Sequence, residues 1–280
     1  MRTKMRIERQ PGFPEPGAPG LFWLGQAGFW IETGDHRILI DPYLSDSLAV
    51  KYAGRHNDHR RMMPPPVAVL DLPRPDLVLV THAHTDHMDG DTLRPLAERY
   101  PGLPFVVPAA KLAVARERIG GDVLLLPAEA DTRIEPVPGV AVTVFPAAHE
   151  TRERDGEGRD LFLGYGIEAE GLRLYHSGDT IPFDGLAERL AAFAADIALL
   201  PVNGRDADRL AAGIPGNMTL AEAVDLARQA GSAWLVPHHF GLFAFNTIDE
   251  AAIDRAAEDA ASPAIVKPVA GETIAMLRDD

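Results

Sequence analysis

The stretch His82-Ala83-His84-Thr85-Asp86-His87 decides how this sequence is interpreted. It follows Leu77-Val78-Leu79-Val80, a short and wholly apolar run that is typical of a strand buried on both faces. Residues two apart at a strand end point the same way, so the first two histidines are expected to converge, and the final Asp-His pair projects from the turn that follows. Imidazole and carboxylate are suitable ligands for zinc, iron or manganese. The four groups, split two and two, therefore predict a site for two neighbouring metal ions.

The alternative is a polar loop that is rich in histidine by chance. The chain contains 10 histidines among its 280 residues, and three of them lie in this hexapeptide. So local a concentration is improbable for a solvated loop, and the metal-binding interpretation is preferred.

Further ligand candidates stand where three later strand-like runs end. His149 follows the run 142–148, Asp179 follows 172–178, and the pair His238-His239 follows 233–237. Any one of them alone would more often be an ordinary loop residue. They share a position beyond a strand, however, and binding sites of α/β proteins lie outside the carboxyl ends of strands. In Ser177-Gly178-Asp179 the glycine permits close backbone approach, so the carboxylate can bridge two cations.

The order of these groups resembles the metallo-β-lactamase superfamily. The pattern is His82-x-His84-x-Asp86-His87, followed by His149, Asp179 and His239, within a resemblance that spans roughly residues 20 to 275. The resemblance implies that His82, His84 and His149 hold one metal. It also implies that Asp86, His87 and His239 hold the other, with Asp179 as the bridging ligand. His239 is preferred to His238 because the related patterns read Pro-x-His.

Finer features resemble one branch of the superfamily. Three segments, Trp23–Gly28, Tyr175–Asp179 and Val236–Gly241, together resemble the subgroup related to ascorbate-6-phosphate lactonase. That subgroup shares patterns with phospholipase D-like members that act on N-acyl phosphatidylethanolamine. The chain has no cysteine, which excludes the zinc-site cysteine of one class of true β-lactamases, as well as disulfides and thiolate nucleophiles.

Strand and helix signals alternate along the chain. Strands are predicted at 21–33, 37–41, 77–80, 123–126 and 140–145, with a hairpin over 161–176 that turns at Glu170-Gly171. Helices are predicted at about 91–100, 109–119, 184–195, 219–230 and 247–261. The last two have capping-box spacing, from Thr219 to Glu222 and from Thr247 to Glu250. Residues 1–20 are interpreted as an irregular N-terminal lead-in, and 21–280 as a single domain.

Two hairpin sequences resemble each other. Gly28-Phe-Trp-Ile-Glu-Thr leads into Arg37–Asp41, and Gly164-Tyr-Gly-Ile-Glu-Ala leads into Arg173–Asp179, so each ends in an aspartate. The similarity is either chance or a sign of two related halves, each a sheet covered by helices, packed face to face. The second alternative predicts a four-layer αββα sandwich of the α/β class, the metallo-β-lactamase fold that the resemblance also implies.

The charge balance narrows the range of partners. Lysine and arginine number 27 against 41 aspartates and glutamates, a net charge of −14. Such a chain lacks the electrostatic footprint of a nucleic-acid-binding protein, although a local basic pocket for a small anion is compatible with it. Met1–Gly20 contain no apolar core of a secretory signal, and no stretch approaches about 18 uninterrupted apolar residues. A cytoplasmic protein without membrane or nucleic-acid partners is expected, and a homo-oligomer is left open.

The predicted function is that of a dinuclear metal-dependent hydrolase. Two divalent ions, zinc or manganese with iron as a further candidate, would lower the pKa of a shared water and hold the hydroxide that attacks a small, anionic ester, lactone or phosphodiester. Asp86 is the predicted catalytic residue, relaying a proton to the leaving group. One alternative is a nuclease or RNA-processing phosphodiesterase of the same fold, which the acidic charge disfavours. Another is a non-catalytic or redox member, which would usually carry a flavodoxin-like domain.

Residues on the substrate side are less constrained by the sequence. The segment Lys51–Arg61, within the irregular loop 45–66, is the richest basic stretch of the chain. It is either a solvated loop or a rim where Arg60 and Arg61 bind an anion. His176 either lines the pocket or is a buried structural residue. Asp41 is either an outer partner that orients a metal-binding histidine or a turn residue before Pro42.

Overall fold

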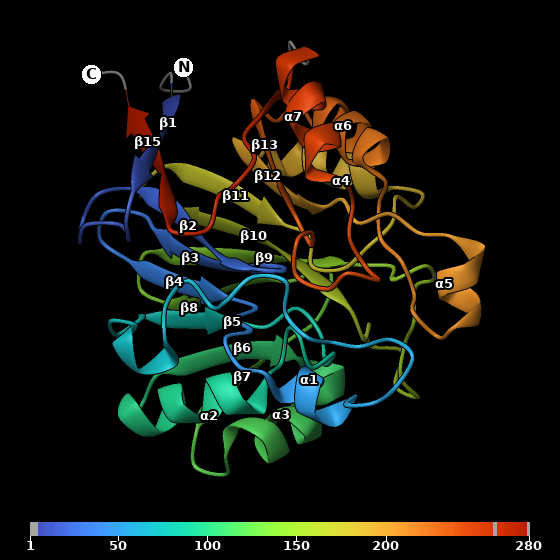
Figure 1. Cartoon of the computed structure of the whole chain (residues 1–280). Coiled ribbons are helices and arrows are strands. Elements are labelled where there is room, and N and C mark those ends of the chain that lie inside the picture. Colours follow the sequence, from blue (N-terminus) through green and yellow to red (C-terminus); the bar gives the residue numbers. More distant parts are fainter. Residues whose placement is uncertain (1–4, 260–261, 279–280) are drawn as a thin grey trace.

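The structure, a computed structural model, describes residues 5–259 and 262–278, and within them the chain forms two mixed β-sheets (Figure 1). The first sheet contains, in spatial order, β1 (Met5–Pro11), β15 (Glu272–Arg278), β2 (Gly20–Gly25), β3 (Gly28–Glu32), β4 (Arg37–Ile40), β5 (Leu77–Leu79), β6 (Pro104–Pro108) and β7 (Leu124–Ala128). The second contains β14 (Ala264–Ile265), β13 (Trp234–His238), β12 (Ile197–Pro201), β11 (Leu172–His176), β10 (Leu163–Ala169), β9 (Val140–Pro146) and β8 (Arg133–Val137).

Helices cover the outer face of each sheet (Figure 1). The first sheet is covered by α2 (Gly90–Arg99) and α3 (Leu112–Ile119), with the short 3-10 helices η1 (Val69–Asp71) and η2 (Ala109–Lys111) nearby. The second is covered by α4 (Leu186–Phe193), α6 (Leu220–Gln229) and α7 (Glu250–Asp259). Two short helices, α1 (Ser47–Lys51) and α5 (Ala207–Ala211), lie in the loops after β4 and β12. The predicted four-layer αββα sandwich is therefore confirmed.

Alternation along the strands of the first sheet separates two layers of the core. In β3, Phe29 and Ile31 belong to the cluster between the sheets, whereas Trp30 between them belongs to the cluster beneath α2 and α3. All three side chains are fully buried. Because both faces of such a strand are covered, apolar residues occupy every position, which explains the unbroken apolar run of β5.

The two sheets repeat one topology. Strands β2 to β4 form an antiparallel meander, and β4 continues through parallel pairs to β5, β6 and β7. Strands β9 to β11, followed by β12, β13 and β14, have the same order and directions. Asp41 follows β4 and Asp179 follows the equivalent strand β11. The similarity of the two hairpin sequences therefore coincides with two halves of like topology.

The N-terminal segment corrects one expectation. An irregular lead-in over residues 1–20 is wrong for Met5–Pro11, which form β1 and pair antiparallel with β15. The strand lies at the edge of the sheet and most of its side chains are exposed or half-buried. Charged residues are tolerated on an edge strand. Only Met5 and Ile7 alternate with them and pack against the core, which is too short a pattern to indicate a strand in the sequence.

Local signals are confirmed at some element ends and corrected at others. The predicted strand 21–33 is a hairpin, because the chain turns at Gln26, where φ is 51°. The capping box at the start of α6 is confirmed, since Thr219 and Glu222 each accept the backbone N–H of the other. Thr247 does not cap α7, which begins at Glu250; its hydroxyl accepts the Gly241 N–H. Residues 260 and 261, at the end of the predicted helix 247–261, lie outside the described residues.

A membrane-crossing helix would have to be both long and apolar. None of the helices in the described ranges meets both requirements.

The buried position of β5 provides a test of this packing. We expect Leu77→Ala to lower the free energy of unfolding by about 2–5 kcal/mol, because it removes a fully buried side chain and leaves a cavity between the sheets. The same substitution at Leu124, which is 48% exposed in the edge strand β7, should lower it by less than about 1 kcal/mol. Urea unfolding followed by circular dichroism measures both values. Equal losses would contradict this description of the core.

Candidate metal centre

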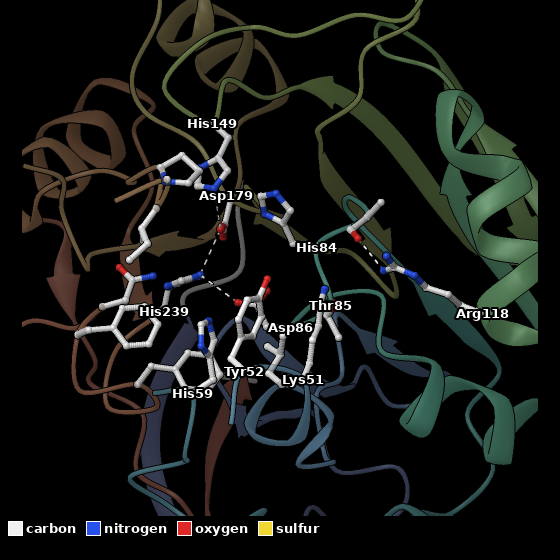
Figure 2. Close-up of a pocket in the computed structure, with 18 residues that line it drawn as sticks. Lys51, Tyr52, His59, His84, Thr85, Asp86, Arg118, His149, Asp179 and His239 are labelled. Atoms are coloured by element: carbon white, nitrogen blue, oxygen red, sulfur yellow. Dashed lines mark hydrogen bonds and ion pairs between the residues drawn. The ribbon is translucent and has the colours of Figure 1, made fainter. Parts of the chain in front are cut away.

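Polar side chains gather where strands of both sheets end (Figure 2). The turn after β5 is held by the His84 carbonyl, which accepts the His87 N–H at 3.1 Å and the Met88 N–H at 2.8 Å, so the chain folds back on the strand end. His149 follows β9, Asp179 follows β11 and His239 follows β13. The structure thereby brings all seven predicted ligands into one cluster, which consists of His82, His84, Asp86, His87, His149, Asp179 and His239.

Asp179 lies at the centre of this cluster. Its Oδ1 is 3.3 Å from His87 Nε2, and its Oδ2 is 3.1 Å from His239 Nε2 and 3.6 Å from His149 Nε2. The turn before it requires glycine, because Gly178 has a φ of 60° and a Cβ there would lie 2.7 Å from the Leu163 carbonyl oxygen and 2.8 Å from Thr81 Cβ. The glycine therefore lets Asp179 approach the end of the first sheet, where Thr81 lies.

Three overlapping groups of potential ligand atoms result, each with its atoms within 4.8 Å of one another. One is Asp86, His87 and His239, a set that the resemblance also implies. Another is His84, His149 and Asp179. The third is His82, His87 and Asp179, so His82 joins the cluster through the shared carboxylate and not directly with His84 and His149.

Asp41 orients one of the cluster's histidines. It accepts a hydrogen bond from His87 Nδ1 at 2.7 Å, so Nε2 of that ring faces Asp179. Asp41 is itself held by the backbone N–H of Thr81 at 2.8 Å and by the Thr81 hydroxyl at 2.5 Å. Its side chain is fully buried. Asp41 therefore has the contacts of an outer partner of the cluster, and not those of an ordinary turn residue.

A glycine loop orients His149 in the same way. His149 Nδ1 donates to the Gly216 carbonyl at 3.1 Å, which turns Nε2 toward Asp179. The Gly216 N–H donates to Glu150 at 2.7 Å. A Cβ at Gly216 would lie 2.2 Å from Arg205 Cβ, so no larger residue fits this loop without displacing it.

Gln26 belongs to the cluster, although it is not among the residues predicted from the sequence. The side chain is fully buried, and Nε2 donates to Asp86 Oδ2 at 2.8 Å and lies 3.2 Å from His239 Nε2. Its backbone carbonyl accepts the His239 N–H at 2.9 Å and the Trp23 indole N–H at 3.0 Å. Gln26 lies in the segment Trp23–Gly28 that carries the finer resemblance, which was the one signal in the sequence that pointed to it.

Electrostatics separate neutral imidazoles from a charged one. Burial lowers the pKa of His149 to about 4 and holds the pKa of His82 well below its ordinary value, so each ring is neutral at pH 7 and offers a lone pair. Burial alone would also lower the pKa of His87, but the carboxylates of Asp179 and Asp41 raise it well above the ordinary value. Burial would raise the pKa of Asp179, but His239 and His87 hold it well below the ordinary value.

The cluster fits a divalent metal ion. Imidazole nitrogens and carboxylate oxygens are the donors that zinc, manganese and iron accept. His82 Nε2 is buried without a hydrogen-bond partner among the described residues. An unpartnered buried polar atom costs about 1–3 kcal/mol, so this lone pair points to a ligand that the protein does not itself supply.

A cavity of about 250 Å³ opens onto the cluster (Figure 2). Its walls come from α1 and the loop after it, from the loop 213–215, and from the segment 243–246. Arg118 of α3 reaches the cavity from the side opposite His239, where it donates to the carbonyls of Ala83 at 2.6 Å and Met88 at 3.1 Å. The guanidinium therefore braces the turn that carries His84 and Asp86.

The two arginines expected at the substrate rim do not line this cavity. Arg60 is exposed and pairs with Asp58 at 2.6 Å. Arg61 is half-buried and donates to the backbone carbonyls of Tyr43, Ser45 and Met63. Of the two alternatives for this loop, a substrate-binding rim formed by Arg60 and Arg61 therefore does not agree with the structure. Arg61 instead holds its own loop in place. Lys51 and Arg118 are the lysine and arginine that line the cavity within the described ranges.

Of the two alternatives for His176, the structure agrees with the buried structural residue and not with a residue that lines the pocket. It is fully buried, with Nε2 donating to the Ala27 carbonyl at 2.8 Å and Nδ1 accepting the Gly178 N–H at 3.1 Å. His238 stacks on this ring with centroids 4.7 Å apart. The next residue, His239, has a φ of 62°, and its side chain lies in the cluster. The structure places His239 and not His238 among the candidate ligands.

Comparison with known proteins gives consistent relatives. The profile of a family described as the beta-lactamase superfamily domain matches residues 36–240. The chain is 31% identical over 217 residues to a metal-dependent hydrolase of Polynucleobacter asymbioticus, covering 68% of this chain and 67% of that protein. It is 28% identical over 197 residues to N-acyl-phosphatidylethanolamine-hydrolyzing phospholipase D 1 of Caenorhabditis elegans, covering 65% of this chain but only 54% of that protein. A solved metallo hydrolase of Ignicoccus hospitalis has a TM-score of 0.67 and 21% identity, covering 94% of this chain and 100% of that one.

The two adjacent histidines can be told apart by metal binding. We expect His239→Ala to weaken zinc binding more than about 100-fold. Removing a ligand should lower the zinc affinity more than removing an outer partner does, which typically costs about 10- to 100-fold. His238→Ala should keep its zinc while its melting temperature falls, because the side chain is fully buried outside the cluster. Elemental analysis after dialysis against buffered zinc measures the zinc content of both variants, and thermal unfolding measures the melting temperature. Zinc lost from His238→Ala and retained by His239→Ala would reverse the assignment.

Asp41 gives a second test of how the cluster is supported. We expect Asp41→Asn to lower zinc affinity about 10- to 100-fold, because an amide oxygen accepts the His87 N–H less strongly than a carboxylate does. The control is Asp76→Asn, since Asp76 accepts the Arg37 N–H at 2.9 Å away from the cluster. Competition with a chromophoric chelator measures both affinities. An unchanged zinc affinity in Asp41→Asn would show that Asp41 stabilises only the local turn and does not support the cluster.

Proposed function

The chain belongs to the beta-lactamase superfamily and is a metal-dependent hydrolase, and we propose that it works with two divalent metal ions held by its His/Asp cluster. The position of Asp179 carries the proposal. Its Oδ1 faces His87 and its Oδ2 faces His149 and His239. A carboxylate shared between two sets of imidazoles is the arrangement that a metal pair needs.

The family pattern gives the ligand sets of this proposal, and the meeting of all seven side chains in one cluster supports it. One ion would be held by His82, His84 and His149. The other would be held by Asp86, His87 and His239, with Asp179 shared. Zinc, manganese and iron all suit such donors. When bound, such ions would lower the pKa of a water molecule and polarise the carbonyl or phosphoryl oxygen of the substrate.

The protein's own groups divide the remaining tasks. Asp86 lines the cavity, and its Oδ2 accepts a hydrogen bond from the amide of Gln26. Its Oδ1 is then available to take the proton of the attacking water and pass it to the leaving group. Asp41 and Gly216 hold the rings of His87 and His149 with Nε2 toward the cluster. Because these contacts exist before substrate binds, the site is preorganised.

The proposed substrate is a small molecule with an ester, lactone or phosphodiester bond. The resemblance to the ascorbate-6-phosphate lactonase subgroup favours a lactone, and the relative named as a phospholipase D favours a phosphodiester. Both reactions need water directed at a polarised oxygen, so one site serves either. Lys51, which lines the cavity, replaces Arg60 and Arg61 as the cation available to an anionic substrate.

A metal titration combined with a substrate panel tests the proposal. Chelator-treated protein is reloaded with zinc or manganese, its metal content is counted, and carboxylic esters, lactones and phosphodiesters are assayed. We expect two ions per chain and hydrolysis of at least one class. Asp179→Ala should lose activity by more than about 100-fold, because it removes the shared ligand, yet keep the wild-type circular dichroism spectrum. A single ion at saturation, or full activity of Asp179→Ala, would refute the dinuclear mechanism.

A further inference from the structure

An aromatic wall lines the cavity beside the cluster. It consists of Tyr52, His59, Phe243 and Phe245. The Tyr52 and His59 rings stack at 4.2 Å with an interplanar angle of 19°, and Phe243 and Phe245 meet the edge of His59 at 5.1 Å and 4.7 Å. Figure 2 shows Tyr52 and His59 near Asp86 and His239, on the side of the cavity away from Arg118. The wall is therefore adjacent to the groups proposed to hold the reacting bond.

The wall is held in place by contacts within the loop after β4 and by one contact from that loop to the segment after β13. Arg61 donates to the carbonyls of Tyr43 and Ser45, and the Met62 N–H donates to the Leu242 carbonyl at 2.8 Å. His59 Nδ1 donates to the Asn57 carbonyl at 2.8 Å, which fixes the ring at the centre of the wall. A surface ordered before binding loses little conformational freedom when a ligand arrives, which favours affinity.

The exposure of the rings separates binding surface from core. Phe243 is buried and packs in a small apolar cluster with Tyr43, Leu48 and Leu242. Tyr52, His59 and Phe245 are half-buried and line the cavity. The volume of about 250 Å³ exceeds the roughly 150 Å³ that is enough for a benzene molecule in a protein cavity. The cavity therefore has room for one ring against the wall.

We propose that the aromatic wall is a specificity subsite that binds a flat, apolar group of the substrate, an aromatic ring above all, attached next to the hydrolysed bond. An aromatic substituent would gain from burying its apolar surface against the wall and, in addition, from contacts between its ring and the rings of the wall. The inference rests on the proposed function for the position of the reacting bond. It makes a sugar phosphate a poor substrate and an aromatic ester or lactone a good one.

The test measures binding of three carboxylates that carry the same charge and differ in their substituent: benzoate, cyclohexanecarboxylate and acetate. Titration calorimetry uses the full chain, both metal-loaded and metal-depleted. We expect benzoate to bind about 10- to 100-fold more tightly than acetate, with cyclohexanecarboxylate between them. Phe245→Ala and Tyr52→Ala should each lower the ratio of benzoate to acetate affinity about 3- to 10-fold. Phe193→Ala, a half-buried aromatic residue of α4 outside the cavity, is the matched control and should leave the ratio unchanged.

Two results would overturn the inference: equal affinity for benzoate and acetate in the wild type, or an unchanged ratio in whichever wall variants fold. The two variants lie on different loops, so the failure of one to fold leaves the other informative. The proposed function fails separately, since it depends on metal content and hydrolysis of the panel. Ring selectivity without hydrolysis would support the subsite alone. Hydrolysis of acetate esters and benzoate esters with the same KM, together with equal carboxylate affinities, would support the function and reject the subsite.

Discussion

Burial of the Asp179 carboxylate between the ends of two sheets is the interaction on which this structure depends. A buried carboxylate is unfavourable unless opposite charge or hydrogen bonds compensate it. The compensating groups come from separate strand ends, with His87 after β5, His149 after β9 and His239 after β13. Gly178 brings the carboxylate close enough to the first sheet, and Asp41 and Gly216 turn the imidazoles toward it. Much of the local geometry around the cluster can be understood as support for this one group.

The two halves share a topology and use it for different purposes. Asp41 and Asp179 follow equivalent strands, and both are almost fully buried. Asp41 hydrogen-bonds Thr81 and the outer nitrogen of His87, so it stays one layer behind the cluster. Asp179 is carried further by the turn through Gly178 and meets the inner nitrogens of three histidines. The face-to-face packing of the halves makes this possible, because it sets the end of each sheet against the other.

Chemistry and specificity are carried by different parts of the chain. The candidate ligands follow directly from core strands, whose burial holds their positions. The aromatic wall stands on the loops 45–66 and 243–246, which can vary without disturbing those strands. Arg61 joins the two roles, because the loop that it clamps carries Tyr52 and His59. Because part of the cavity wall is aromatic, a small molecule can bind there without a basic protein surface. A net charge of −14 is therefore compatible with a small-molecule hydrolase.

The sequence by itself determined the fold class and the seven candidate ligands of the cluster. Apolar runs predicted the buried strands and the donors placed just beyond them, and the resemblance to the metallo-β-lactamase superfamily implied that these donors form one metal centre. Strands that lack such a run, like the charged edge strand β1, escaped detection.

Only the tertiary structure decided which neighbours these residues contact. His239 faces the cluster while His238 stacks on His176, and Gln26 reaches Asp86 across 60 residues of sequence. The guanidinium of Arg61 donates to a carbonyl of its own loop, and the His59 ring packs between Tyr52 and Phe243. Spacing along the chain specifies where a side chain starts, whereas its partners depend on the packing of segments that are distant in sequence, and a single sequence carries no direct signal for that.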